Sequence, residues 1–156
     1  MACAAWAMGE AGIDLVDASV PWSGLVESGQ DLVLHDALCP TAPPAFLAAC
    51  LERARETGHV VVGVRPVTDT VKVVADGVVG TTLDRDGLLA IASPLVLPAA
   101  VLASLAQRPS GDLARAVGDL ATSGHRVETV EAPPEGRRVA SEEDVRLLEA
   151  LTRPLR

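Results

Sequence analysis

Apolar runs that end in polar or charged residues are the main feature of this chain. Three of them cover residues 31–40 (DLVLHDALCP), 60–72 (VVVGVRPVTDTVK) and 82–94 (TLDRDGLLAIASP). A buried strand that delivers functional side chains at its carboxyl end has this pattern. We therefore expect a buried sheet with polar residues at its strand ends.

The segments around these runs predict the other elements. The Asp76-Gly77 pair predicts a tight hairpin turn within 71–84, and Ser141 precedes an acidic first turn that suits a helix start. In chain order we expect a helix over 1–12, a strand over 13–19, a turn-rich stretch over 21–30, a strand over 31–37, a helix ending at Gly58, a strand over 59–67, the hairpin, a strand over 88–96, helices over 98–108 and 112–124, a strand over 125–132 and a helix over 141–155.

This alternation of strands and helices favours an α/β fold with a mostly parallel sheet. The length of 156 residues indicates one domain over 1–156, with the hairpin as an arm over about 68–86. Apolar residues make up 49% of the chain and aromatic residues only 2%. The core must therefore be built from aliphatic side chains, which suit helices packed on a sheet.

Charge and cysteine usage exclude several classes of partner. The net charge of −8 argues against nucleic acid and against an anionic membrane surface. No apolar run is long enough to span a bilayer.

The three cysteines are odd in number and lack metal-ligand spacing. They indicate free thiols in a reducing cytoplasm, so we expect a cytoplasmic protein.

The polar residues after the expected strands allow both functional and structural interpretations. Asp36 is either a site residue or the cap of a strand-end turn. His35 beside it is more typical of a buried, hydrogen-bonded neighbour than of a general base. A nucleophilic pair of Cys39 with His35 would lack a third group to orient the histidine.

Two further clusters are equally open. The stretch 68–70 (TDT) is either part of a site or a polar turn that opens the hairpin. The stretch 84–87 (DRDG) either contacts phosphate through Arg85 or is a solvated charged turn. Arg137 and Arg138 are either site cations or a surface pair that offsets nearby glutamates.

The ordered series HDALCP, PVTDTVK, TLDRDGLLAIASP and GRRVASEEDV resembles the 2-C-methyl-D-erythritol 4-phosphate cytidylyltransferase family over residues 31–152. The resemblance implies a Rossmann-like sheet with flanking helices and a β-hairpin dimerisation arm in a homodimer. It also implies a Mg²⁺-dependent transfer of CMP from CTP to a sugar-alcohol phosphate, a nucleotidyltransferase step of isoprenoid biosynthesis that releases pyrophosphate.

The same resemblance assigns roles to individual residues. It implies substrate binding by Asp36, Thr70, Arg85 and Ser93, with Thr70 and Arg85 acting across the dimer interface. It implies a catalytic role for Arg138, which stands where the family has a lysine and keeps the charge with a different geometry.

Departures from the family pattern limit what the resemblance implies. Cys39 stands where the family has an arginine, which removes a donor from the site. The family opens with a strand and a glycine-rich loop whose cations and backbone N–H groups hold the CTP triphosphate. This chain has no glycine-rich phosphate loop and no Lys or Arg before Arg53. We therefore expect a fold truncated at its amino end.

Three hypotheses follow for the function. The chain is a degenerate cytidylyltransferase that is inactive alone, a part of an enzyme that begins upstream, or a non-catalytic structural or regulatory dimerisation partner of an active paralogue. In the last case its arm completes the partner's site. Whether the chain is an enzyme, and whether it binds CTP, stays open at this point.

Overall fold

The structure is a computed structural model that describes residues 2–17 and 19–153. Within these residues the helices are α1 (Ala2–Glu10), α2 (Trp22–Glu27), α3 (Pro44–Thr57), α4 (Ala99–Ser104), α5 (Leu113–Thr122) and α6 (Glu142–Thr152), with a short 3₁₀ turn η1 (Pro134–Gly136). The strands are β1 (Leu32–Leu34), β2 (Val60–Pro66), β3 (Val71–Ala75), β4 (Val78–Leu83), β5 (Leu89–Leu97) and β6 (Val127–Glu131).

Four strands form the main sheet in the order β1-β5-β2-β6. The β2–β6 pair is parallel, whereas β5 runs antiparallel to both of its neighbours. Three strands thus share one direction and β5 alone is reversed, so the expected α/β class is confirmed. Because β1, β2 and β6 point the same way, their carboxyl ends meet at one edge of the sheet.

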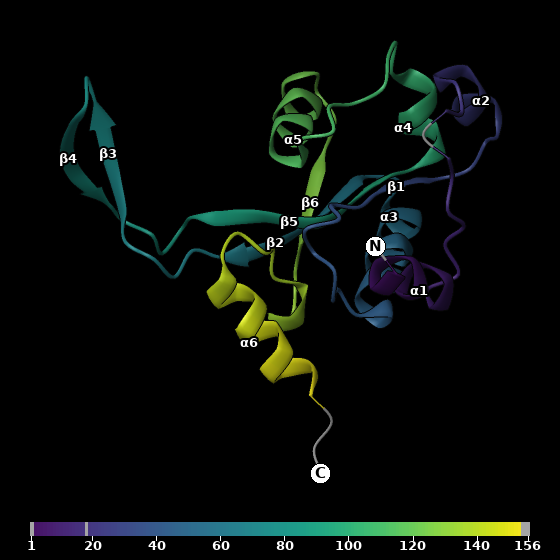
Figure 1. The fold of residues 1–156 in the computed structure, drawn as a ribbon. Helices are drawn as coiled ribbons and strands as arrows, with labels where there is room; N and C mark the ends of the chain where they lie inside the picture. The colour runs from purple at the N-terminus through teal and green to yellow at the C-terminus, as the bar shows by residue number, and fades with distance from the viewer. Residues whose placement is uncertain (1, 18, 154–156) are drawn as a thin grey trace.

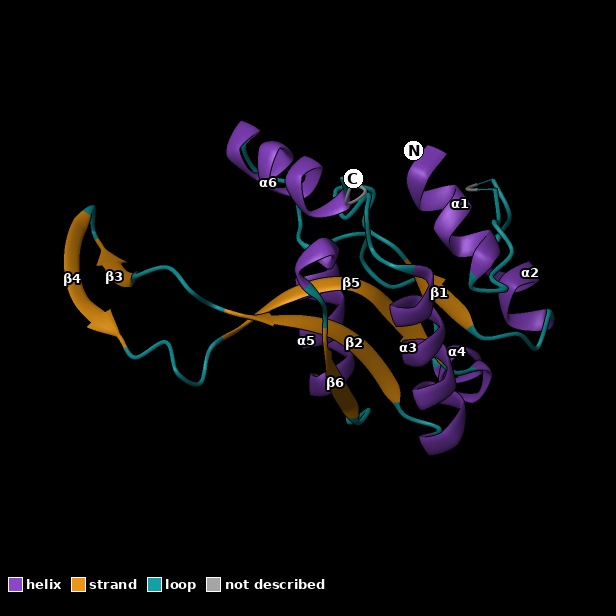
Figure 2. Ribbon diagram, turned by 90° about the horizontal axis from the view of Figure 1, so that it is seen from below, coloured by secondary structure: helices purple, strands orange, loops and turns teal. Residues whose placement is uncertain are grey.

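Helices cover both faces of this sheet (Figure 1). On one face, α3 packs against Val61 and Val96, and α1 packs beside α3. On the other face, α2, α4 and α5 pack against the opposite sides of β2 and β5. Figure 2 looks onto this sheet and shows the twist expected of it. Aliphatic residues dominate the core, as the composition predicted.

A glycine is required at position 63 of β2, because both β5 and α3 lie close to the backbone there. A Cβ atom added to Gly63 would lie 2.9 Å from the Ser93 carbonyl oxygen and 3.2 Å from the Phe46 ring. The β2–β5 register is irregular between Val62 and Val64, next to this contact. Gly63 therefore allows α3 and β5 to pack closely against the middle of β2.

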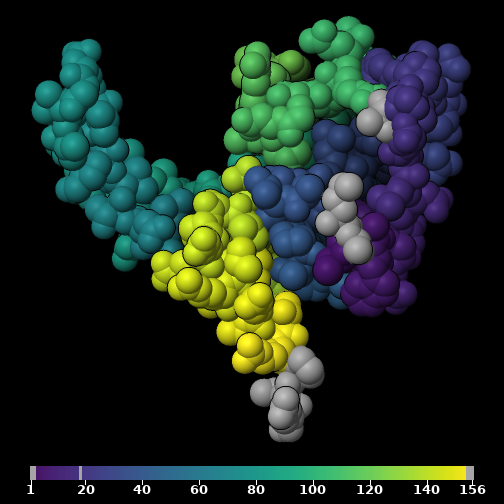
Figure 3. Space-filling view, viewed as in Figure 1, coloured from purple at the N-terminus to yellow at the C-terminus, as the bar shows by residue number. Residues whose placement is uncertain are grey.

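The predicted hairpin is confirmed and stands apart from the main sheet. Strands β3 and β4 form their own two-stranded sheet, joined by Asp76 and Gly77 with φ of 51° and 77°. Positive φ at both central residues is the geometry of the expected tight turn. Figures 1 and 3 show this arm projecting from the body of the protein. We use the name "arm" below for residues 68–86.

Two predictions for the amino-terminal region are wrong. Residues 13–17, expected to form a strand with 18 and 19, have no regular structure, and residue 18 lies outside the described residues. The backbone N–H of Ile13 donates to the Met8 carbonyl and so closes the end of α1 instead of pairing with β1. The turn-rich stretch contains α2, which forms because Trp22 and Val26 pack on the core.

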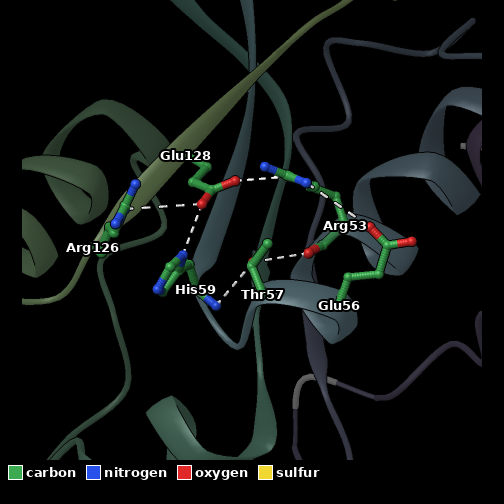
Figure 4. A network of polar contacts seen from close by, with 6 residues as sticks. All are labelled: Arg53, Glu56, Thr57, His59, Arg126 and Glu128. Atoms are coloured by element: carbon green, nitrogen blue, oxygen red, sulfur yellow. Dashed lines mark hydrogen bonds and ion pairs between the residues drawn. The ribbon is translucent and has the colours of Figure 1, made fainter.

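A cluster of polar side chains connects α3, β2 and β6 at the amino ends of the two strands (Figure 4). The Glu128 carboxylate accepts a hydrogen bond from Arg53 Nε at 2.8 Å and pairs with His59 Nδ1 at 2.7 Å. Arg126 Nε lies 3.9 Å from the same carboxylate. Hydrogen bonding to His59, followed by Arg53, lowers the pKa of Glu128. This cluster lies at the opposite end of the strands from the polar residues that the sequence singled out.

No helix among the described residues is long and apolar enough to cross a bilayer. The cysteines at 3, 39 and 50 are unpaired thiols. Cys50 faces the core from α3, and burial raises its pKa to about 12.

Candidate active site at the carboxyl edge of the sheet

Asp36 lies just after β1 and is held by two donors. The Leu38 backbone N–H donates to Asp36 Oδ1 at 2.9 Å, and Arg138 Nε donates to Asp36 Oδ2 at 2.7 Å. Asp36 therefore caps a strand-end turn and also forms an ion pair with a residue 102 positions away. Partial burial alone would raise the pKa of Asp36, but the hydrogen bonds from Leu38 and Arg138 outweigh it and lower the pKa.

Arg138 reaches Asp36 because the segment after β6 crosses the sheet edge. Thr41 Oγ1 donates to the Glu135 carbonyl at 2.6 Å, and the Val139 N–H donates to the Leu38 carbonyl at 2.7 Å. The hydrogen bond to Asp36 raises the pKa of Arg138, so the guanidinium stays charged. The Arg138 side chain is 51% exposed, and this exposure leaves its outer N–H groups open to a ligand.

Arg137 and Arg138 have different surroundings despite being neighbours. Arg137 Nη1 donates to Asp144 at 3.0 Å, and Ser141 with Asp144 forms a capping box at the start of α6. The backbone N–H of Ala140, Arg137 and Ser141 together lower the pKa of Asp144 to about 2. Arg137 thus supports α6, whereas Arg138 forms, with Asp36 and Ser93, the group that we call the strand-end cluster.

Ser93 lies behind Asp36 and is fully buried on β5. Its hydroxyl accepts the Asp36 backbone N–H at 3.0 Å and lies 2.6 Å from His35 Nδ1. The other ring nitrogen of His35, Nε2, lies 3.1 Å from the Cys39 carbonyl oxygen. Burial, against the opposing effect of that carbonyl and of Asp36, lowers the pKa of His35.

Thr70 and Arg85 lie on the arm and are exposed. Arg85 Nη1 donates to the Thr68 carbonyl within the arm. The structure therefore brings together three of the predicted site residues, Asp36, Ser93 and Arg138. Thr70 and Arg85 lie apart from this group, in the segments of the arm that flank β3 and β4.

Cys39 stands at the position where the family resemblance puts an arginine. Its side chain is fully buried, and burial raises the pKa of its thiol. A buried, neutral thiol is not an activated nucleophile. Cys39 instead takes part through its backbone, because its carbonyl faces His35 and its N–H donates to the Asp36 carbonyl at 2.8 Å.

One contact at this edge was not predicted from the sequence, and one expectation is confirmed. Arg65 at the end of β2 donates to the Ala132 carbonyl at 2.9 Å, which anchors the beginning of the segment that carries Arg138. His35 links Ser93 to the Asp36 turn. For Arg65 the sequence shows only an arginine at the end of an apolar run, whereas the expected hydrogen-bonded surroundings of His35 are confirmed.

The described residues do not form a complete protein cage for a Mg²⁺ ion. Among them, no group of three or more His, Cys, Asp or Glu side chains is placed to hold a metal ion. Both oxygens of Asp36, the carboxylate in this cluster, already accept hydrogen bonds. Mg²⁺ commonly takes one or two protein carboxylates together with substrate phosphates and water.

Solved structures share the fold described above. The chain matches the 2-C-methyl-D-erythritol 4-phosphate cytidylyltransferase of Thermus thermophilus with a TM-score of 0.61 and 21% identity, covering 89% of this chain and 72% of that one. It matches 4-diphosphocytidyl-2C-methyl-D-erythritol synthase of Anaerococcus prevotii with a TM-score of 0.60 and 18% identity, covering 90% and 68%. These likenesses show that the chain has a Rossmann-like α/β fold.

The family follows from the sequence comparisons. The sequence model of the IspD family, described as 2-C-methyl-D-erythritol 4-phosphate cytidylyltransferase, matches residues 19–153. A protein of that name from Lysinibacillus sphaericus is 33% identical over 79% of this chain and 54% of its own length. One from Nocardia farcinica is 37% identical over 76% and 52%. The chain belongs to the 2-C-methyl-D-erythritol 4-phosphate cytidylyltransferase family, and it spans about half the length of these curated relatives.

Proposed function

We propose that this chain supplies the sugar-phosphate side of a cytidylyltransferase site, and that by itself it transfers little or no CMP from CTP. The observation that carries the proposal is the 2.7 Å pair of Arg138 with Asp36 at the carboxyl edge of the sheet. This edge is where open α/β sheets bind their ligands.

The arrangement suits a phosphate monoester on a small polyol. Asp36 holds Arg138 through Nε, which leaves the two terminal nitrogens of the guanidinium free to donate to phosphate oxygens. Because Arg138 is half exposed, a ligand can reach it without moving the core. A guanidinium fixed on one side loses less freedom when it binds the phosphate than a mobile one would.

Transfer of CMP from CTP requires a second set of groups in the site. Negative charge on the reacting phosphate has to be stabilised by cations or N–H groups placed in advance. Residues 1–52 of this chain contain no Lys or Arg and no glycine-rich phosphate loop. We therefore expect catalysis to need groups that this chain does not itself contain. Mg²⁺ would enter with the nucleotide.

The test uses two calorimetric titrations and one assay on the purified chain. We expect 2-C-methyl-D-erythritol 4-phosphate to bind, CTP with Mg²⁺ to bind weakly or not at all, and pyrophosphate release to stay at background when both are present. Sustained pyrophosphate release would refute the inactive part of the proposal. Absence of phosphate-monoester binding would refute the assigned site.

A second candidate function is that of a dimerisation partner, and the arm favours it. The arm exposes large apolar side chains on both of its strands: Val73, Val74, Val78, Val79 and Leu83. Exposed apolar patches of this kind mark interaction surfaces. We propose that the chain forms a cytoplasmic homodimer through the arm. The alternative is a heterodimer with an active paralogue, in which Thr70 and Arg85 complete the paralogue's site. Sedimentation of the chain alone, and mixed with a longer member of the family, separates the two.

A further inference from the structure

We propose that His35 and Ser93 are positioning residues, which hold Asp36 against Arg138 through a directed chain of hydrogen bonds that exists only while His35 is neutral. The consequence for ligand binding rests on the proposed function above. The hydrogen-bond chain itself can be tested without any ligand.

The direction of the chain follows from its ends. The Cys39 carbonyl can only accept, so His35 Nε2, at 3.1 Å from it, carries the proton. In the neutral ring Nδ1 is then an acceptor, and the Ser93 hydroxyl at 2.6 Å donates to it. Because the Ser93 hydroxyl proton is donated to His35, the Ser93 oxygen accepts the hydrogen bond from the Asp36 N–H at 3.0 Å. Every bond in the chain has one allowed direction.

The chain fixes the turn that carries the Asp36 carboxylate. The turn closes on itself through Cys39 N–H to the Asp36 carbonyl, at 2.8 Å, and Leu38 N–H to the Asp36 side chain. The Ser93 hydroxyl attaches this turn to β5, in the centre of the sheet. Since Arg138 reaches the turn from the segment after β6, the position of Asp36 sets where the guanidinium lies.

Protonation of His35 would disturb this arrangement. Both ring nitrogens would then donate, so Ser93 would accept from His35 and its own hydroxyl proton would have no partner in a fully buried place. The groups that face His35 are Asp36 and Cys39 from its own turn, Ser93 from β5 and, beyond Asp36, Arg138. On its other side His35 borders an open cavity of about 1050 Å³, whose charged lining is Asp14, Asp17, Asp31, Arg55 and Arg108.

The direct test is ¹⁵N NMR of the His35 ring and of the Arg138 Nε–H group in the unliganded chain, assigned with His35→Gln and Arg138→Lys. At neutral pH we expect one His35 tautomer, protonated at Nε2. As the pH falls to about 5, the Arg138 Nε signal should move together with His35 protonation, and His35→Gln should abolish that movement. An Nδ1-protonated ring, or an Arg138 signal indifferent to His35, would overturn the proposal.

Variants of Ser93 separate positioning from stability. Ser93→Ala should shift the Arg138 Nε signal towards that of Asp36→Asn and weaken phosphate-monoester binding about five- to tenfold. Ser93→Thr keeps the hydroxyl and should restore both, while Ser104→Ala on α4 is the matched control. A lower melting temperature in Ser93→Ala with an unmoved Arg138 signal would reduce Ser93 to a structural role. If the wild type binds no phosphate monoester, the NMR result still decides the inference.

Discussion

The strand-end cluster and the arm divide the predicted site residues between two very different regions. Asp36, Ser93 and Arg138 are joined by hydrogen bonds of 2.7 to 3.0 Å from three separate parts of the chain. Thr70 and Arg85 lie on an exposed hairpin whose strands pair only with each other. One group of the predicted site residues is joined within the chain, and the other lies exposed on the arm.

The strand-end cluster and the arm differ in what fixes their conformation. Strands β2 and β5 are buried along most of their length, so their geometry is fixed by the core. The arm has almost no buried residue, although it is rich in valine. An isolated two-stranded hairpin is marginally stable in water. We infer that the arm is stabilised by packing against another surface.

The largest contrast should appear in the free energy of unfolding. Leu95 on β5 is fully buried, so Leu95→Ala should destabilise the chain by about 2–5 kcal/mol. Val79 in the arm is 64% exposed, so Val79→Ala should change the stability by less than about 0.5 kcal/mol. Urea denaturation at low protein concentration measures both. Equal losses would mean that the arm belongs to the core.

The second contrast concerns association. Val78→Asp, in the most exposed part of the arm, should weaken self-association about tenfold or more, which corresponds to about 1.4 kcal/mol. A charge placed in an apolar contact has to be desolvated, which is the physical reason. Sedimentation equilibrium gives the dimer constant. The matched control is Val145→Asp on α6, also exposed, which should leave the constant unchanged.

The third prediction concerns His35 in the strand-end region and the pH dependence of the protein's stability. The pKa of His35 is lowered in the folded chain, from 6.5 towards more acidic values. Below about pH 6.5 the unfolded chain therefore binds more protons, and stability falls as the pH drops towards the folded pKa. Urea midpoints at about pH 7.5 and 5.5 should differ more for the wild type than for His35→Gln. An identical pH dependence in the two proteins would contradict the buried neutral ring.

The smallest effect should come from the polar cluster at the other end of the strands. Glu128→Gln keeps hydrogen-bonding capacity but removes the ion pairs with Arg53 and His59. Ion pairs near the surface contribute little and are screened by salt. The melting temperature should fall slightly, less than for Leu95→Ala and less in high salt. A loss as large as that of Leu95→Ala would make this cluster a determinant of the fold.

The sequence predicted most elements because their signals are local. The Asp76-Gly77 turn, the Ser141 cap and the apolar runs of β2 and β5 each depend on a few neighbouring residues. The segment 13–17 has the composition of a strand, but its conformation depends on the end of α1. Helix α2 likewise forms because Trp22 finds the core, a contact that no local pattern shows.

For the site, the sequence supplied the residues but not their partners. Asp36 and Arg138 were each open to a structural interpretation, and only the fold shows that they meet across 102 positions. The sequence shows Cys39 only as a lost donor, because its burial and its carbonyl contact with His35 depend on the three-dimensional turn. Long-range hydrogen bonds of this kind leave no periodic trace in a sequence.

The most direct test of the central claim is a calorimetric titration of 2-C-methyl-D-erythritol 4-phosphate into the wild type, Arg138→Met and Arg146→Met. Arg146 is an exposed arginine of α6, paired with Glu142 at 3.6 Å, and serves as the matched control. Loss of a charged hydrogen-bond donor should weaken binding about 10- to 100-fold in Arg138→Met, with Arg146→Met equal to the wild type. Equal affinity in all three proteins would contradict the assignment of the phosphate to the Asp36–Arg138 pair.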